Sequence, residues 1–268
     1  SQTLLPVAAE DVLDRVPAIQ AELMRHSLGM EPGLWDEMRH GDAGLRASWR
    51  EFVHWMPLPA TGQTLAEDLD RRVAQVARQI RQDGITHNVF SDQGTAQRPW
   101  SLELLPLIID SADWAVIEAG VAQRAALMQA MLADAYGPQQ LLHDGLFPPA
   151  LLLRHPGYLR SMRGVQPAGG LRLHIVAFDL VRAPDGRWQV LTCRSQGPSG
   201  LGYVLHNRLV ISRQFPEAFR ELRVQHIATS YRRLLDSIES AARQVARGAA
   251  PRVVLLTPGP YAETYFEH

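Results

Sequence analysis

Two neighbouring stretches of the sequence bring together residue types that bind anions. Residues 193–200 are Cys-Arg-Ser-Gln-Gly-Pro-Ser-Gly, and His206, Asn207 and Arg208 follow shortly after them. Guanidinium groups form charge-assisted hydrogen bonds with phosphate and carboxylate. Small residues let the backbone approach a ligand closely, and the N–H groups at a helix N-terminus attract the same anions. These residue types therefore indicate a phosphate or carboxylate site.

The helix that would supply these N–H groups is expected over residues 203–215. Residues 197–200 form a glycine-rich elbow in front of it, and Ser199 is the expected cap. Arg194 and Arg208 would add positive charge. An ordinary strand-to-helix connection with solvent-facing arginines explains the same residues equally well, so the residues alone leave both interpretations open.

No local signature of a common catalytic mechanism is present. The sequence has no GxSxG, HExxH or GxxxxGK motif, which would mark a nucleophilic serine, a zinc site or a P-loop. Cys193 is the single cysteine, so neither a disulfide within the chain nor a paired-cysteine metal site can form. The ten histidines are scattered, and a lone one such as His174 is more often structural than a ligand. No histidine is therefore assigned to a metal.

An antiparallel hairpin is expected to position Asp179 and Thr192 in front of the elbow. Residues 171–179 alternate in the manner of a strand, and Asp179 closes the run. Pro184-Asp185-Gly186 is typical of a turn, and residues 187–193 form the returning strand. Asp179 is thus placed near the end of the first strand and Thr192 near the end of the second.

Helices are expected on both sides of this hairpin. Thr64 and Glu67 form a capping box that opens one of them. Apolar residues spaced near 3.6 predict a long helix over residues 111–136 and another over residues 226–246. The apolar run at residues 253–257 predicts a buried strand, the first element of a Rossmann-type unit.

Three regions are expected along the chain. Residues 1–62 form a helical region, with helical spacing over residues 7–55, and the prolines and glycine of residues 56–63 mark its end. Residues 63–250 form the main lobe, and residues 251–268 begin a further segment. The expected fold is α/β in composition and α+β in type, rich in helices and containing an antiparallel hairpin.

Composition and charge exclude some partners. The 268 residues include 27 Lys and Arg against 28 Asp and Glu, so no net field favours nucleic acid or an anionic membrane. Glu10 and Asp11 argue against a signal peptide, and no apolar run reaches the roughly 20 residues of a membrane span. A soluble protein of the reducing cytoplasm is therefore expected.

Five segments resemble, in the same order, those of circularly permuted ATP-grasp proteins, the class related to glutathionylspermidine synthases. They are THNVFSD, the helix over residues 114–136, FDLVR with the turn after it, GPSGLGYVLHNRLV and TPGPYAETYFEH. The resemblance covers residues 84–268 and implies an ATP-grasp-like lobe followed by the start of a Rossmann-like segment. The chain is expected to be truncated before the rest of the permuted fold. It should then expose apolar surface that favours self-association into a homo-oligomer.

The resemblance also implies an activity, that of an ATP-dependent carboxylate–amine ligase. ATP phosphorylates a small-molecule or peptide carboxylate, an amine attacks the acyl phosphate to give an amide, and Mg²⁺ neutralises the triphosphate. Catalytic roles are implied for Asp179, Arg194 and Ser199, with Asp179 also a metal ligand. The residues implied in ATP binding are Arg182, Gln196, Gly200, Asn207 and Arg208.

The metal pattern of that family is incomplete in this sequence. Family members have an Asp that ends the first strand and a Glu-x-Asn on the second. Here Asp179 matches the first position, but the Glu position is Thr192 and the Asn position is Arg194. His206 stands where a Glu is usual, and Ala262 where an Asn is frequent. Two unit charges about 4 Å apart interact by roughly 4 kcal/mol at an effective dielectric near 20, so an arginine beside a metal ion would repel it by at least that much. Arg194 could instead contact Asp179 or phosphate and supply the positive charge itself.

Three functional hypotheses follow from the resemblance and its departures. The first is an amide-forming ligase on a peptide or amino-acid-like substrate. The second is a catalytically degenerate ATP-grasp-like protein that serves as a binding or scaffolding component. The third is that the fold is kept while the ligand has changed, because a fold does not dictate a function.

Overall fold

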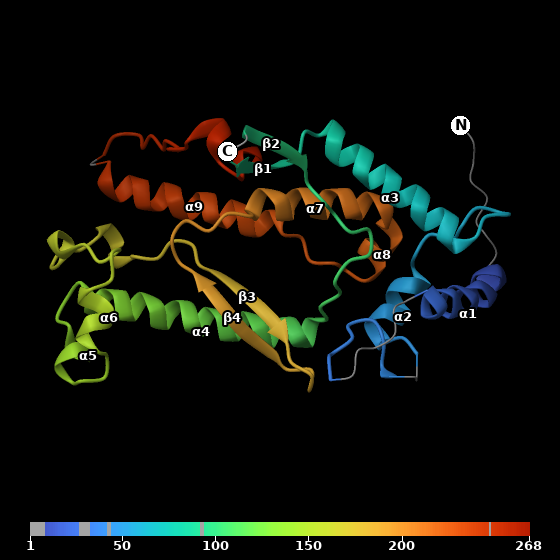
Figure 1. Ribbon diagram of the computed structural model, residues 1–268, viewed down its shortest axis with the longest axis horizontal. Coiled ribbons are helices and arrows are strands. Elements are labelled where there is room, and N and C mark those ends of the chain that lie inside the picture. The colour runs from blue at the N-terminus through green and yellow to red at the C-terminus, as the bar shows by residue number, and fades with distance from the viewer. Residues whose placement is uncertain (1–8, 27–32, 42–43, 92–93, 247) are drawn as a thin grey trace.

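The computed structural model describes residues 9–26, 33–41, 44–91, 94–246 and 248–268. This part of the chain is rich in helices and has two short antiparallel sheets, which confirms the expected α+β class (Figure 1). The helices are α1 (Ala9–His26), α2 (Ala47–His54), α3 (Leu65–Gln82), α4 (Ser111–Ala135), α5 (Gln140–His143), α6 (Pro149–Leu153), α7 (Leu201–Gln214), α8 (Pro216–Glu221) and α9 (Ala228–Val245). The strands are β1 (Thr86–Ser91), β2 (Gly94–Pro99), β3 (Ala177–Arg182) and β4 (Trp188–Arg194).

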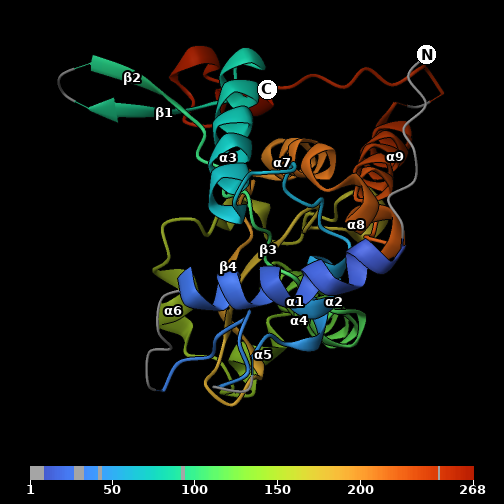
Figure 2. The same cartoon turned by 90° about the vertical axis from the view of Figure 1, so that its right-hand side faces the viewer.

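The first hairpin, β1 and β2, projects from the body of the molecule (Figure 2). Thr86 pairs with Pro99 at its base. The β-branched and aromatic residues of this stretch predict strand structure, and the pairing confirms it. Just beyond the base, the Trp100 N–H donates to the Ile85 carbonyl at 3.0 Å, which continues the pairing into the body.

The second hairpin, β3 and β4, confirms the antiparallel pair expected before the elbow. Asp179 lies opposite Thr192, and a bulge follows Asp179. Gly186 in the turn has φ +82°, and an added Cβ would lie 2.4 Å from the Trp35 ring. The turn therefore requires glycine at this position for two reasons: other residues rarely adopt its backbone conformation, and a side chain would collide with the tryptophan ring.

The first strand of this hairpin begins later than its sequence pattern predicts. Residues 171–176 pair with no strand in the described part of the chain, so Asp179 is the third residue of β3 and not its last. The physical reason is Gln129 on α4. Its amide accepts from two backbone N–H groups, at 2.8 and 3.0 Å, and donates to one carbonyl, at 3.0 Å, within residues 170–173. A helix side chain thus satisfies backbone groups that a neighbouring strand would otherwise satisfy.

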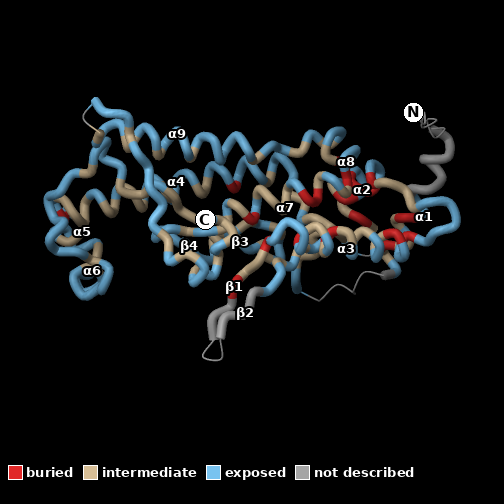
Figure 3. Tube along the Cα trace, turned by 90° about the horizontal axis from the view of Figure 1, so that it is seen from above, coloured by how far each residue is buried: buried red, intermediate tan, exposed pale blue. Residues whose placement is uncertain are grey.

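The buried core gathers where α1, α2, α3, α7 and α8 meet (Figure 3). Phe215 is fully buried, and its ring packs edge-on against Phe52 with the centroids 5.0 Å apart. Phe52 packs in the same way against Trp49, at 5.5 Å. The core therefore draws on both the expected helical region 1–62 and the main lobe.

Two separate helices, α1 and α2, replace the helical pattern expected over residues 7–55. Ile19 and Leu23 on α1 are buried, as their spacing predicts. The side chains of Val12 and Val16, expected on the same stripe, lie outside the described residues. The described residues between the two helices are not α-helical, so the pattern predicted more helix than forms.

The start of α3 is fixed by the capping box that Thr64 and Glu67 predict. The Glu67 N–H donates to Thr64 Oγ1 at 3.2 Å, and the Thr64 N–H donates to Glu67 Oε2 at 2.9 Å. Next to it Asp68 is only 1% exposed and accepts from Arg72 Nε at 2.6 Å. Arg72 also donates to the Gln214 carbonyl at 2.7 Å. This buried network therefore joins α3 to the end of α7.

Large apolar side chains remain exposed outside the core. α4 buries one residue, Ile117, and none of the residues of α9, all of them described, is buried. The accessible surface is 19052 Å², whereas a compact monomer of this mass exposes roughly 12,000 Å². None of the helices in the described ranges has both the length and the apolarity of a membrane span. The open surface thus provides area for contacts with other polypeptide.

The buried strand expected at residues 253–257 does not form. These residues form neither a helix nor a strand, and the side chains of Val254 and Leu256 are 77% and 97% exposed. An apolar run becomes a buried strand only when neighbouring strands and helices cover it. No strand in the described part of the chain pairs with this run, so the prediction of a buried strand is wrong for this structure.

Replacing Asp68 should destabilise the fold in a pH-dependent manner. Burial alone would raise the pKa of Asp68, but the hydrogen bonds and charges of Arg72 and Arg71 outweigh burial and lower it. Asp68→Asn removes the carboxylate that balances the charge of the partly buried Arg72, which keeps its bond to the Gln214 carbonyl, so we expect the free energy of unfolding to fall by about 3 kcal/mol. Urea unfolding measures this change, and Asp70→Asn, at an exposed site on the same helix, should change it by less than about 0.5 kcal/mol.

Unfolding measurements at several pH values test the direction of this effect. A lowered folded-state pKa adds stability that is fully present above the unfolded pKa of about 3.9. That stability is lost as the pH falls through the folded pKa. The difference between wild type and Asp68→Asn should therefore be constant from pH 7 to 5 and shrink below pH 4. A difference that persists unchanged at pH 3 would contradict the assignment.

Candidate functional site

Asp179, Thr192 and Arg194 form a polar triad on one face of the β3–β4 hairpin. Thr192 donates through Oγ1 to Asp179 Oδ2, and Arg194 Nη2 donates to the same oxygen at 2.8 Å. Side chains alternate between the faces of a strand, and Cys193 faces α4, with its Sγ 3.3 Å from the Sδ of Met128. The polar triad therefore lies on the face away from α4.

The triad contains one negative group, Asp179, and one positive group, Arg194, so its net charge is zero. The hydrogen bond from Thr192 and then that from Arg194 hold the pKa of Asp179 below its usual value. Asp179 is thus a carboxylate at neutral pH, paired with the guanidinium. The Asp179 side chain is 40% exposed and that of Arg194 67%, so the pair faces solvent and the remaining donors of the arginine are accessible.

The metal role implied for Asp179 does not fit this arrangement. Mg²⁺ in proteins is held by carboxylates, commonly one or two together with phosphate groups. Asp179 supplies one carboxylate, which Arg194 already neutralises. Within the part of the chain that the structure describes, no three His, Cys, Asp or Glu residues lie together as a metal site requires. No step of a mechanism is therefore assigned to a metal here.

Arg182, implied in ATP binding, lies at the turn end of the hairpin and does not join the triad. Its Nη1 is 2.6 Å from Asp113 and 3.6 Å from Glu37. The guanidinium also lies 4.6 and 4.8 Å from the ring centroids of Trp35 and Trp188. These contacts fix the hairpin turn to α4 and to the N-terminal region, so the side chain is occupied within the fold.

The N-terminus of α7 binds a carboxylate from the far end of the chain. The Gly200 N–H lies 2.9 and 2.8 Å from the two oxygens of Glu267, and the Gly202 N–H donates to Oε1 at 2.6 Å. The N-cap is Gly200, and Ser199 is exposed and makes no capping hydrogen bond. The prediction of Ser199 as cap is therefore wrong. The elbow binds an anion, as its residues predict, but that anion belongs to the chain itself.

Two glycines allow this contact. Gly200 has φ +118°, a conformation that other residues rarely adopt. At Gly202 an added Cβ would lie 3.1 Å from the Cγ of Glu267. The glycine spacing of the elbow is thus explained by an internal carboxylate without any external ligand.

Asn88 holds the segment that carries Glu267. It is 1% exposed, and its backbone N–H donates to the Glu263 carbonyl at 2.8 Å. Its Nδ2 donates to the carbonyls of Pro260 and Ala262, each at 3.2 Å. Ala262, which stands where the family often has Asn, therefore contributes through its backbone. The first and last of the resembling segments meet at this residue.

An aromatic stack fills the space between these segments. The ring of Tyr203 lies 4.3 Å from that of Trp100 and 5.4 Å from that of Phe266, measured between centroids. Burial raises the pKa of Tyr203, and its hydroxyl donates to the Thr86 carbonyl at 2.6 Å. Asn207, implied in ATP binding, accepts from Trp100 Nε1 at 3.0 Å. Asn207 is therefore part of this packing.

The other implied residues are dispersed around α7. Gln196 is exposed. Arg208 is half-buried with its guanidinium 5.6 Å from the Phe219 ring centroid, and burial lowers its pKa. His206, at the position where a Glu is usual, lies with Nε2 2.9 Å from Asp83 Oδ2. The structure thus gathers Asp179 with Arg194 but does not bring the ATP-binding set to one point.

Two residues at the centre of this arrangement, Glu267 and Asn88, were missed by reasoning from the sequence. Both lie inside the resembling segments, in TYFEH and THNVFSD, but neither was given a role. The available signal was the elbow itself. A glycine-rich helix start without a side-chain cap requires an acceptor from elsewhere, and an acid in another of these segments is the natural candidate.

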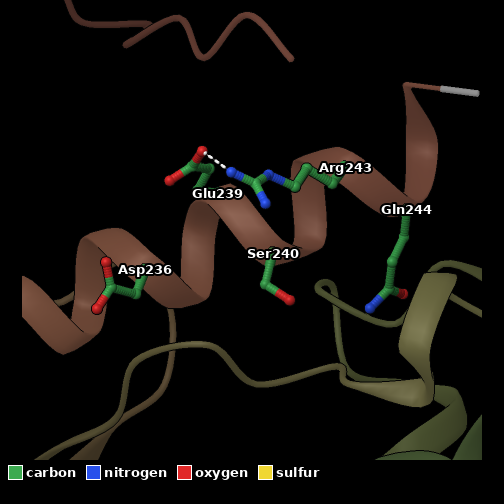
Figure 4. Close-up of a pocket in the computed structure, with 5 residues that line it drawn as sticks. All are labelled: Asp236, Glu239, Ser240, Arg243 and Gln244. Atoms are coloured by element: carbon green, nitrogen blue, oxygen red, sulfur yellow. Dashed lines mark hydrogen bonds and ion pairs between the residues drawn. The ribbon is translucent and has the colours of Figure 1, made fainter. Parts of the chain in front are cut away.

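A hollow beside α9 is separate from these groups. It is lined by five α9 side chains, and Figure 4 shows Glu239 and Arg243 paired to each other, at 2.6 Å. Ser240 and Gln244 point toward the neighbouring loop, where Gln244 approaches Gly169. The hollow contains no residue implied in the site, so the hairpin and the start of α7 remain the candidate site.

The helix-rich α+β lobe, with a hairpin leading through an elbow into a helix, is consistent with an ATP-grasp-like fold. The family model described as circularly permuted ATP-grasp type 2 matches residues 106–268. The chain belongs to this family, which confirms the resemblance to circularly permuted ATP-grasp proteins over the matched residues.

Three relatives of this chain carry names that call them uncharacterized proteins. The chain is 37% identical over 241 residues to Rv2567 of Mycobacterium tuberculosis, covering 87% of this chain and 26% of that protein. It is 34% identical over 241 residues to sll0335 of Synechocystis, covering 89% and 48%. It is 36% identical over 203 residues to Rv2411c of M. tuberculosis, covering 76% and 36%. The chain therefore spans half or less of the length of each of these relatives.

Replacing Glu267 should loosen the start of α7. Glu267→Gln keeps the shape but removes the charge that accepts from the Gly200 and Gly202 N–H groups. Hydrogen bonds to charged groups contribute about 1.5–3 kcal/mol net, and the amide keeps one acceptor. We therefore expect unfolding free energy to fall by about 1–2 kcal/mol. Amide hydrogen exchange at residues 200–202 should become faster.

Glu263→Gln is the matched control for this change. Glu263 lies in the same segment and its side chain is exposed, so its replacement should leave both measurements nearly unchanged. Unaltered exchange at residues 200–202 in Glu267→Gln would show that the carboxylate does not hold the helix start.

Proposed function

We propose that the chain is part of an ATP-dependent carboxylate–amine ligase of the ATP-grasp type. In this reaction ATP phosphorylates a peptide or amino-acid-like carboxylate, and an amine then displaces phosphate from the acyl phosphate to form an amide. Family membership supports the ATP-grasp type in general. Amide formation and a glutathionylspermidine synthase-like specificity are the finer parts of the proposal.

The observation that carries the proposal is the accessible guanidinium of Arg194 on a hairpin that leads directly into the elbow. Asp179 and Thr192 fix the hairpin face from which Arg194 projects. A guanidinium at this point can bind the oxygens of a carboxylate or of a phosphoryl group. It would stabilise the negative charge that develops on those oxygens during transfer. Asp179 in this proposal positions Arg194.

The proposed partners follow from the same chemistry. They are a small-molecule or peptide carboxylate, an amine, and ATP as the source of the phosphoryl group. Cytoplasmic location and self-association are further proposals, the second because so much apolar surface is exposed.

Trapping of the acyl phosphate tests the proposed reaction. The full chain is incubated with ATP, Mg²⁺, glutathione as the carboxylate and hydroxylamine in place of the amine. Hydroxylamine attacks the acyl phosphate and yields a hydroxamate and phosphate, which are measured together with ADP. We expect hydroxamate and ADP in equal amounts. Arg194→Ala should reduce the rate by about a hundredfold, the effect of removing one preorganised donor.

Arg187→Ala provides the control for the trapping experiment. Arg187 lies on the same hairpin, but its guanidinium is 78% exposed and pairs with Asp185 at the turn. Its removal should leave the rate unchanged. Equal losses in both variants would mean that charge on the hairpin as a whole, and not Arg194, is what matters.

One observation favours a second function, a catalytically degenerate component that binds or scaffolds. The single carboxylate of the triad is already neutralised by Arg194, so the metal implied for catalysis in this family does not fit. A chain that binds ATP without forming ADP or hydroxamate would support this second function over the first. A chain that binds no ATP at all would contradict the ligase proposal.

A further inference from the structure

The charges of the polar triad are those expected where an arginine side chain stands in the place of a metal ion. Asp179 carries one negative charge, Arg194 one positive charge and Thr192 none. A divalent ion added to this group would bring two charges with no carboxylate left to balance them. The family resemblance implies a metal on this hairpin, and the triad contradicts it.

The geometry of the triad differs from that of an ordinary surface ion pair. Isolated exposed pairs are weak and hold no fixed arrangement. Here two donors meet on one oxygen, Asp179 Oδ2, and one of them is the hydroxyl of Thr192, which lies directly opposite on the paired strand. The position of the carboxylate is thereby set by the sheet register, and the position of Arg194 is set by the carboxylate.

Arg194 retains capacity for a ligand in this arrangement. A guanidinium has five N–H donors, and among the described residues the structure shows Arg194 donating to Asp179. Its side chain is 67% exposed. The planar fork of donors matches two oxygens of a phosphate or carboxylate group.

We infer that Arg194 takes the place of the divalent metal that the family implies for this hairpin, and that the hairpin binds a phosphate-type anion directly, without a metal ion. The inference rests on the proposed function only in taking the anion to be the phosphate chain of a nucleotide. Thr192 and Asp179 act as positioning residues for the guanidinium.

Binding of tripolyphosphate in the presence of EDTA tests the anion part of this inference. Calorimetric titration of the full chain should show binding without metal. Arg194→Asn should weaken it by at least about tenfold, as expected for the loss of charge-assisted hydrogen bonds. Arg187→Asn, which removes the exposed arginine at the hairpin turn, should leave the affinity unchanged. Binding that appears only after Mg²⁺ is added, or no binding in either condition, would overturn the inference.

A gain of metal binding tests the replacement itself. The double variant Thr192→Glu with Arg194→Asn restores the Glu-x-Asn pattern opposite Asp179. Titration with Mn²⁺ alone, followed by electron paramagnetic resonance, should show one ion bound to the double variant and none bound to wild type at millimolar concentration. Wild type that binds Mn²⁺ as tightly as the double variant would contradict the inference. So would a double variant that is folded by circular dichroism but binds no Mn²⁺.

These outcomes separate the inference from the proposed function. A chain that binds tripolyphosphate in EDTA but forms no hydroxamate would keep the inference and lose the ligase function. A chain that forms hydroxamate but binds tripolyphosphate only with Mg²⁺ would keep the function and lose the inference.

Discussion

The capture of the Glu267 carboxylate by the first N–H groups of α7 is the contact on which the arrangement of this lobe depends. A helix start leaves N–H groups that need acceptors, and here the acceptor comes from 65 positions further along the chain. The same segment is held on its other side by Asn88. β1, α7 and the segment over residues 259–268 therefore form one unit. The negative charge at the helix N-terminus is also favourable in itself.

The features that could be predicted from the sequence are those whose contacts join residues close together in the chain. The capping box of Thr64 and Glu67 and the turn at Pro184-Asp185-Gly186 involve residues within a few positions of each other, and both formed as expected. The features that were missed depend on distant partners. The backbone N–H groups of Arg172 and Leu173 donate to Gln129 on α4, so the first part of the alternating run does not pair with a strand. Nothing within residues 171–176 carries that information, because their alternation alone is compatible with a strand.

The residues of the candidate site show the same difference between what the sequence predicts and what distant partners decide. The family resemblance was enough to assign Asp179, Thr192 and Arg194 to one hairpin, and the strand pairing observed in the structure places Thr192 opposite Asp179 with Arg194 on the same face. For Arg182 the strand pattern gave no guidance, because its place is decided by Asp113 and by the ring of Trp35, which lies far away in the sequence. Competition between partners, and not strand geometry, determines that Arg194 remains accessible while Arg182 does not.

The contacts made within the fold and the exposed surface together indicate which groups of this lobe are available to bind a ligand. Arg182 is paired with Asp113, Asn207 with Trp100, and the Gly200 N–H with Glu267. Groups already satisfied within the fold have little reason to bind a ligand, since each contact would first have to be broken. Arg194 differs because its pairing leaves most of its donors in solvent. α4 and α9 leave apolar side chains such as Leu127 and Leu235 in solvent, and the Arg194 side chain is itself 67% exposed. A reacting group bound at Arg194 would therefore be shielded from water only when another polypeptide surface covers the lobe, and such shielding is what strengthens the interaction of a guanidinium with an anion.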